Sequence, residues 1–119
     1  MLPEAGDIAW FEFDPVEGTE QAGRRPALVL TSLGYHQRSG RAVVCPISSR
    51  GRTWAFNVPL PPETKTRGFV MTDQVRTVER NKRMFSVIER VPDFVLNDVR
   101  GRLAALLGID VIASIAPPP

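Results

Sequence analysis

Cysteine and histidine are almost missing from this sequence: its 119 residues include one of each, Cys45 and His36. A single cysteine cannot form an intramolecular disulfide, so folding does not depend on an oxidising compartment. One histidine and one cysteine also cannot supply the ligands of a His/Cys zinc site. Any chemistry must therefore do without a histidine-rich or cysteine-rich centre, and neither a metal nor another cofactor is expected.

Long apolar runs are also missing. No stretch approaches the roughly 20 residues that cross a bilayer, and the N-terminus carries acids where a secretory signal would carry Lys or Arg. We therefore expect a cytoplasmic protein with no membrane partner. Hydrophobic residues make up 43% and charged residues 24% of the chain, as in soluble globular proteins. The length predicts one domain, 1–119, with a core over about 6–108 and a tail at 109–119.

Basic residues are absent from the first 23 positions, which hold six acids. Residues 24–90 reverse that balance with thirteen basic residues and four acids, although the whole chain carries a net charge of only +2. Such segregation predicts a basic face that suits a polyanion, beside an acidic element. A solvated surface whose charges interleave after folding is the other interpretation, and charge alone does not decide between them.

The pattern of apolar residues and turn signals predicts a mainly β fold. Short strands are expected at 6–13, 26–31, 41–47, 54–60, 69–71, 76–78 and 83–91. Between Pro92 and Gly108, apolar residues from Val95 to Leu107 recur at helical spacing, which predicts a C-terminal helix with a buried stripe. About six or seven short antiparallel strands and one helix indicate a strongly bent sheet or partly open barrel that the helix covers. The apolar residues 109–115 either extend this helix or reach a partner chain.

Several single residues have ordinary structural interpretations. His36 and Tyr35 are expected in an exposed turn. Cys45 lies in an apolar strand, so a core position is favoured over a nucleophilic one. Trp10 is expected in the core. Trp54 is also placed there, although it follows a basic loop and base stacking is the alternative.

The segment that joins the first two expected strands gathers chemically active side chains. Residues 18–26 read GTEQAGRRP and hold a carboxylate at Glu20 and guanidiniums at Arg24 and Arg25. Arg25 precedes Pro26, which favours an extended backbone and gives the side chain a stiff platform. A guanidinium binds a phosphodiester through two parallel hydrogen bonds and keeps its charge at all accessible pH. Glu20 can act as a base if its surroundings hold it in place; an ordinary loop ion pair is the alternative.

The stretch GDIAWFEFDPVEGTEQAGRRPALVL at 6–30 resembles the N-terminal signature of the MazF/PemK (Kid-like) toxins. The similarity continues through PIS at 46–48 and TDQVRT at 72–77, and it spans residues 6 to about 108. Members of that family are small homodimeric endoribonucleases that cut single-stranded RNA at short sequences without a metal. Each is neutralised by a partner antitoxin. The resemblance therefore implies an SH3-like barrel with a C-terminal helix, an RNA substrate, a homodimer and a MazE-like antitoxin.

Matched position by position, the resemblance assigns Arg25 and Glu20 to the catalytic centre. Ser48 stands where the family often has threonine, and its hydroxyl can still donate to a phosphate oxygen. Arg24 stands where relatives often have histidine. The implied RNA-binding residues are Gln21, Arg24, Ser49, Arg50, Arg52, Asp73, Gln74 and Arg76. For the pair at 73–74, hydrogen bonding to backbone groups at a strand break is the alternative.

The implied reaction is attack by a ribose 2′-hydroxyl on its own 3′-phosphate, which leaves a 2′,3′-cyclic phosphate and a 5′-hydroxyl. In it, Arg25 stabilises the charge at phosphorus, Glu20 acts as base or positioner, and Ser48 donates to the phosphate. Two alternatives come from other classes: a CcdB-like toxin that acts on DNA gyrase without catalysis, and an RNA-binding relative that does not cleave. The EQAGRRP stretch disfavours the first, because such a toxin has no use for a Glu–Arg phosphate centre.

Overall fold

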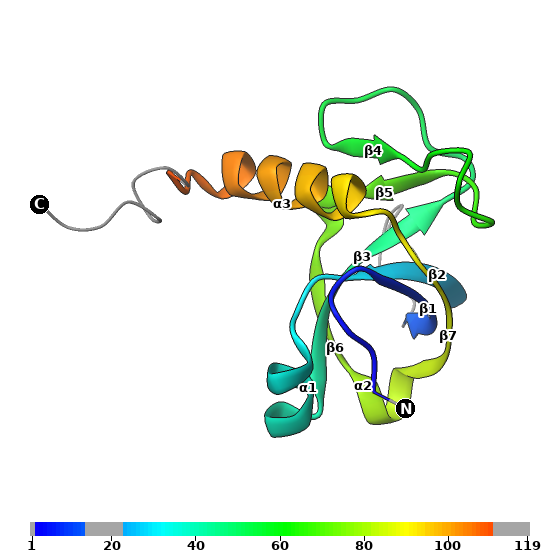
Figure 1. The fold of residues 1–119 in the computed structure, drawn as a ribbon, viewed down its shortest axis with the longest axis vertical. Helices are drawn as coiled ribbons and strands as arrows, with labels where there is room; N and C mark the ends of the chain where they lie inside the picture. The colour runs from blue at the N-terminus through cyan, green and yellow to red at the C-terminus, as the bar shows by residue number, and fades with distance from the viewer. Residues whose placement is uncertain (1, 14–22, 111–119) are drawn as a thin grey trace, which may run out of the picture.

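The computed structural model describes residues 2–13 and 23–110 of the chain. Within them, seven antiparallel strands form one bent sheet, accompanied by two short helices and a longer C-terminal helix (Figure 1). The strands are β1 (Asp7–Phe13), β2 (Gly23–Val29), β3 (Arg41–Ser48), β4 (Asn57–Pro59), β5 (Phe69–Met71), β6 (Arg76–Glu79) and β7 (Met84–Arg90). The helices are α1 (Leu33–Ser39), α2 (Arg80–Arg83) and α3 (Asp93–Leu107), with one 3₁₀ turn, η1 (Thr72–Gln74).

The sheet bends around β3, which pairs with three other strands. The strand order is β4-β5-β3-β2-β1-β7, and β6 also pairs with β3. Residues 41–44 of β3 pair with β6, and residues 47–48 pair with β5. On the opposite edge, residues 44–46 pair with β2. The described strands do not close a ring between β4 and β7, so the prediction of a strongly bent, partly open antiparallel sheet is confirmed.

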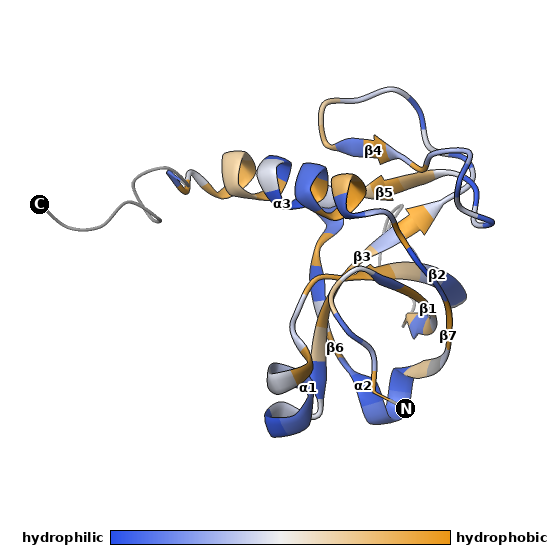
Figure 2. Ribbon diagram, in the orientation of Figure 1, coloured by the Kyte–Doolittle hydropathy of each residue, from blue (hydrophilic) through white to orange (hydrophobic). Residues whose placement is uncertain are grey.

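Apolar side chains fill two buried clusters. One cluster joins the sheet to α3 and includes Ile8, Cys45 and Val99. The other lies among β1, β2, β3 and β6 and includes Phe11 and Phe13. Figure 2 shows apolar residues along β5 and hydrophilic residues along α2. Because each fully buried large apolar side chain contributes about 1.5–3 kcal/mol, these clusters are what holds the bent sheet together. The predicted core position of Cys45 is confirmed.

Helix α3 has the predicted bounds, and Gly108 ends it in the left-handed conformation (φ 73°) that glycine adopts without strain. Val95 and Val99 are fully buried against the sheet. Leu106 and Leu107 are exposed, so the prediction that the whole apolar stripe is buried is wrong. The C-terminal part of α3 projects past the sheet (Figure 1), where the described strands offer no surface to pack against. Most of the apolar segment 109–115 lies outside the described residues.

His36 is buried in α1, so the prediction of an exposed turn is wrong. Its Nδ1 lies 2.8 Å from the carbonyl oxygen of Pro3, which can only accept, so Nδ1 carries the hydrogen. In the neutral ring Nε2 then accepts from the Thr31 hydroxyl at 2.7 Å, and that hydroxyl accepts from the Val43 N–H. The ring thus ties the N-terminal segment to α1 and β3. A lone histidine carries no periodic signal, which is why sequence alone misplaced it.

The strand expected at 54–60 is also shorter than predicted, since only Asn57–Pro59 pairs with β5. The residues before it form a turn, in which the Asn57 N–H donates to the Trp54 carbonyl. The Asn57 side chain donates to the Arg52 carbonyl at 3.0 Å and so holds the same turn. The single-turn helix α2 between β6 and β7 was not predicted. Its four polar residues carry no apolar period from which a helix could be inferred.

Candidate functional site

A cleft of about 550 Å³ lies where β2, β3 and the loop after β3 meet. Its lining residues are Arg25, Ser48, Arg50, Gly51, Arg52, Asn57, Met71 and Gln74. We call it the Arg25 cleft. It brings together the predicted catalytic residues Arg25 and Ser48 with three of the predicted RNA-binding residues. Asn57 and Met71 were missed by the sequence analysis, because nothing local marks an amide or a thioether as part of a site.

Arg25 occupies an interior position of β2, directly opposite Phe11 of β1. The strand begins at Gly23, so the expectation that Pro26 opens it is wrong. Proline is tolerated there because the pairing with β3 starts only at Ala27, which leaves Pro26 with β1 as its one described neighbour. Arg25 is half-buried and fixed by the β1–β2 ladder. This arrangement provides the stiff platform expected for its side chain.

Ser48 is the last residue of β3 and is buried. Its Oγ accepts a hydrogen bond from the Arg50 N–H at 3.1 Å, which fixes the side chain against the following loop. Gly68, just before β5, packs closely against the backbone of Ser48. A Cβ at position 68 would lie 2.3 Å from the Ser48 carbonyl oxygen. The backbone around Ser48 is therefore held from both sides.

A smaller hollow of about 350 Å³ adjoins the Arg25 cleft and shares Arg52, Asn57, Met71 and Gln74 with it. Trp54 lines this hollow and is 50% exposed, so its predicted core position is wrong. Its indole Nε1 donates to Oδ2 of Asp73 at 3.1 Å. Asp73 thus orients an exposed aromatic ring, and no backbone hydrogen bond to its carboxylate is found among the described contacts. Base stacking stays available to Trp54.

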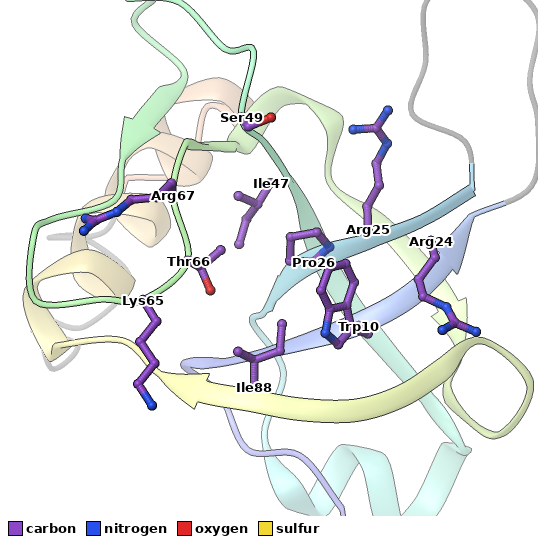
Figure 3. A pocket seen from close by; sticks show the side chains of 10 residues that line it. All are labelled: Trp10, Arg24, Arg25, Pro26, Ile47, Ser49, Lys65, Thr66, Arg67 and Ile88. Atoms are coloured by element: carbon purple, nitrogen blue, oxygen red, sulfur yellow. The ribbon is translucent and has the colours of Figure 1, made fainter.

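A second cleft, of about 480 Å³, lies on the other side of Arg25 (Figure 3). Its lining residues are Trp10, Arg24, Arg25, Pro26, Ile47, Ser49, Lys65, Thr66, Arg67 and Ile88. We call it the Trp10 cleft. Trp10 is 38% exposed, so its predicted core position is wrong. Arg24 and Ser49, both predicted to bind RNA, lie here rather than in the Arg25 cleft. For the basic residues at 65–67, the sequence predicted a loop and no part in a site.

Two of the predicted site residues that the structure describes, Asp73 and Arg76, line neither cleft. Arg76 lines a separate hollow beside Glu12, and its guanidinium lies over the ring of Phe13, 5.0 Å from the centroid. Such a cation–π contact is a structural role that the sequence did not suggest. Glu20 and Gln21 lie outside the described residues.

The titratable groups near the site have identifiable environments. Burial, with the Asp73 carboxylate adding to the effect, raises the pKa of the Cys45 thiol to about 12, so this cysteine stays protonated and inert. Burial also raises the pKa of the Glu89 carboxyl, but hydrogen bonds from Lys65 and Thr66 and the Lys65 charge outweigh it and leave that pKa below its ordinary value. No group of three or more His, Cys, Asp or Glu in residues 2–13 and 23–110 is placed to hold a metal ion.

Across those same two ranges, none of the helices is both long and apolar enough to cross a membrane. The fold and site together define a small bent-sheet protein, closed on one side by a helix, with a cationic cleft at the end of its longest strand. The profile of the family described as "PemK-like, MazF-like toxin of type II toxin-antitoxin system" matches residues 4–107. The chain belongs to this family, and the resemblance drawn from its sequence is confirmed.

Individual relatives agree with the family profile. The endoribonuclease PemK of Escherichia coli is 38% identical over 108 residues, which cover 87% of this chain and 81% of that protein. MazF from Deinococcus radiodurans has a structure that matches with a TM-score of 0.86 at 38% identity, covering 92% of this chain and 99% of that chain. A MazE–MazF complex from the same organism gives a TM-score of 0.81 at 37% identity, with 92% and 99% covered.

Proposed function

We propose that this chain is the toxin of a type II toxin–antitoxin pair and that it cuts single-stranded RNA in the Arg25 cleft. The observation that carries the proposal is the convergence of Arg25, from β2, and Ser48, from the end of β3, on one cleft. Arg50 and Arg52 line the same cleft and supply further positive charge for a phosphodiester. Membership of the family and the endoribonuclease activity named for PemK support the proposal.

The reaction needs no external nucleophile. The ribose 2′-hydroxyl gives up its proton, and the 2′-oxygen forms a bond to the adjacent phosphorus. The bond from phosphorus to the 5′-oxygen breaks, and that oxygen takes up a proton. The products are a 2′,3′-cyclic phosphate and a 5′-hydroxyl. The protein must accept one proton, supply another, and stabilise the extra negative charge that gathers on the phosphate oxygens in the transition state.

Arg25 stabilises that charge, because preorganised cationic donors at the reacting phosphate are usually the largest single contribution. A guanidinium does not give up its proton at accessible pH, so we assign Arg25 no proton transfer. Ser48 has its oxygen oriented by the Arg50 N–H and can donate its own hydrogen to a phosphate oxygen. Glu20 acts as base or positioner, an assignment supported by the family resemblance alone.

The RNA strand follows the positively charged surface on both sides of Arg25. We assign RNA contacts to Gln21, Arg24, Ser49, Arg50, Arg52, Asp73, Gln74 and Arg76. The shared lining of the Arg25 cleft supports Arg50, Arg52 and Gln74. The position of Arg76 over Phe13 makes it the weakest of these assignments among the described residues, since it lines neither cleft nor the hollow that adjoins the Arg25 cleft.

A cognate antitoxin and a second copy of this chain complete the proposed assembly, which acts in the cytoplasm, where messenger RNA is translated. The MazE–MazF complex that this chain resembles supports an antitoxin partner. The excess of basic residues over 24–90 favours an acidic and hydrophobic segment that covers the clefts by charge and shape. RNA cleavage that continued in a saturated toxin–antitoxin complex would contradict this arrangement.

The test is incubation of the purified protein with a long single-stranded RNA in EDTA, followed by mapping of the RNA ends. We expect discrete cuts with cyclic-phosphate and 5′-hydroxyl ends. If the folded, antitoxin-free protein binds the RNA and leaves it intact, the chain is a binding-only relative. If it neither binds nor cuts RNA, the gyrase-directed alternative is favoured instead.

Variants then test the role of Arg25. Arg25→Ala is expected to lower the cleavage rate roughly 100-fold or more, because it removes a donor to the transition state. Arg25→Lys keeps the charge but loses the two-pronged geometry, so it should recover only part of the rate. The matched control is Arg38→Ala, an exposed arginine on α1 that lines neither cleft. Equal cutting by Arg25→Ala and Arg38→Ala would refute the proposed mechanism.

A further inference from the structure

The Trp10 cleft has a floor that suits a flat aromatic ring. Trp10 and Pro26 stand opposite each other on neighbouring strands, and Figure 3 shows the indole lying against the proline ring. Ile88 of β7 and Ile47 of β3 continue the apolar floor beneath them. A half-exposed tryptophan with this support presents a fixed ring at low entropic cost, because its own position is already set by the sheet.

The rim of this cleft is positively charged. Arg24 and Arg25 bound it on the β2 side, and Lys65 and Arg67 line the facing loop. Of the described residues that line the cleft, four are basic and none is acidic. An apolar floor inside a cationic rim matches a nucleotide, whose base is flat and whose phosphates are negative.

The wall that carries Lys65 is held rigidly by β7. Glu89 accepts the Lys65 N–H at 2.9 Å through Oε1, and it accepts the Thr66 N–H and hydroxyl at 2.7 Å each through Oε2. The Thr64 hydroxyl donates to the carbonyls of Pro61 and Thr66, which closes the loop on itself. The cleft therefore has two fixed walls: the strand pair β1–β2 on one side and this tethered loop on the other.

The Trp10 cleft lies next to the proposed catalytic cleft, with Arg25 between them. Arg25 lines both, and Ser49, which lines the Trp10 cleft, directly follows Ser48. We propose that the Trp10 cleft binds one unpaired nucleobase of the RNA strand, adjacent to the phosphodiester that is cut. The base stacks on Trp10, while Arg24 and Lys65 bind the flanking phosphates. This inference rests on the proposed ribonuclease function and adds a substrate subsite to it.

The chemistry favours a nucleobase over a peptide side chain here. An antitoxin segment that covers this cleft must combine acidic and aromatic side chains from separate residues, whereas each nucleotide carries its own negative charge beside its own flat ring. Stacking is tolerant of base identity, since every base has a π-face. The subsite therefore strengthens the binding of single-stranded RNA and excludes duplex, in which no base is free to stack.

The experiment combines protein variants with abasic RNA. Once wild-type protein has located a cut site, RNAs made uncleavable by a 2′-O-methyl group at that site are prepared with single abasic nucleotides on either side of it. We expect one abasic position to weaken wild-type binding by about tenfold to a hundredfold, the usual range for a lost base–aromatic stack. Trp10→Ala should weaken binding of the intact RNA equally and show no further loss with that abasic RNA. On cleavable RNA it should raise KM more than it lowers kcat, because the stack is remote from phosphorus.

Two further variants separate stacking from folding defects. Trp10→Phe keeps an aromatic ring and should bind within about threefold of wild type. Phe94→Ala removes another exposed aromatic side chain, 58% exposed on α3 and outside both clefts, and should bind as wild type does. Thermal unfolding of each variant shows whether its fold is intact.

Several outcomes would overturn the inference while the proposed function stands. One is wild-type cleavage with normal RNA binding by Trp10→Ala. Another is additive losses for Trp10→Ala and every abasic substrate. A third is a Trp10→Ala defect confined to antitoxin binding, which would make the cleft a protein-binding site. Failure of the wild-type protein to cut any RNA would instead overturn the proposed function itself.

Discussion

Gly68 lies so close to the Ser48 backbone that no room is left for a Cβ, and Gly68→Ala tests this packing. Its φ of +120° lies in the region that glycine adopts and side-chain-bearing residues rarely do. A Cβ there would lie 2.3 Å from the Ser48 carbonyl oxygen and 3.0 Å from the Ser49 Cα, and both are backbone atoms. The Gly68 carbonyl also accepts the Leu60 N–H at 2.9 Å, so the segment cannot swing aside freely.

The expected cost has two parts. Backbone strain at an unfavourable φ is worth about 1–3 kcal/mol. Overpacking against atoms that cannot rotate away adds about 1–3 kcal/mol. Together they predict that Gly68→Ala lowers the free energy of unfolding by about 2–6 kcal/mol. At about 4 °C per kcal/mol for a chain of this length, the melting temperature should fall by roughly 8–24 °C.

Urea and thermal unfolding followed by circular dichroism measure this change. The matched control is Gly101→Ala in α3, where the surrounding described segments leave a new Cβ clear by more than 4 Å. That substitution should stabilise the helix by up to about 1 kcal/mol. The substitution is expected to displace β5 from Ser48. The Gly68→Ala variant should therefore also cut RNA more slowly than wild type at temperatures where it is folded. A free energy of unfolding within about 0.5 kcal/mol of the wild-type value is usual for a surface substitution. Such a result for Gly68→Ala would show that β5 does not pack against β3 as described.

Two further predictions concern buried or tethering polar groups. His36→Leu should lower the free energy of unfolding by about 2–4 kcal/mol, because the Pro3 carbonyl and Thr31 hydroxyl lose their partner; a change below measurement error in urea unfolding would argue against the buried network. Glu89 has a lowered pKa in the folded state, so its carboxylate stabilises the fold above its unfolded pKa and this contribution is lost as pH falls through the folded value. The wild type should therefore have a higher free energy of unfolding than Glu89→Gln at pH 7. This difference should shrink below about pH 4.5, the ordinary pKa of a glutamate. A gap that stayed constant down to pH 3 would exclude a role for the charge in holding residues 65–66.

The sequence predicted the parts of the site that depend on local chain chemistry. Arg25 stands beside a proline and Ser48 follows an apolar run, so the sequence placed each directly next to an expected strand, at 26–31 and 41–47. The structure extends these strands to include both residues, in β2 and β3. Their convergence in one cleft confirms that the strands expected around them pair as a bent sheet. The family resemblance, and not spacing, supplied their roles.

Trp10 was expected in the core, whereas the structure leaves it 38% exposed. A register shift between β1 and β7 falls at Ile8 and Ala9, and both residues are fully buried. Such a bulge moves the inward and outward positions by one residue. Phe11 then points into the core and Trp10 faces the cleft. The bulge depends on the pairing with β7, more than 70 residues later in the chain, so it could not be placed from the sequence. The alternation of Phe11, Glu12 and Phe13, however, already puts Trp10 on the same face as Glu12.

The amino-acid sequence by itself determined the mainly β fold, the C-terminal helix with its glycine stop, the basic middle of the chain and the family. These follow from backbone preferences, charge and short motifs, which act between near neighbours. Only the tertiary structure decided which side chains share a cleft. Lys65 and Trp10 line one cleft while Glu89 anchors the loop that carries Lys65, and His36 is buried because Pro3 and Thr31 close around it. Such contacts join segments that are distant in sequence, and their energy exists only when the sheet has bent and brought them together.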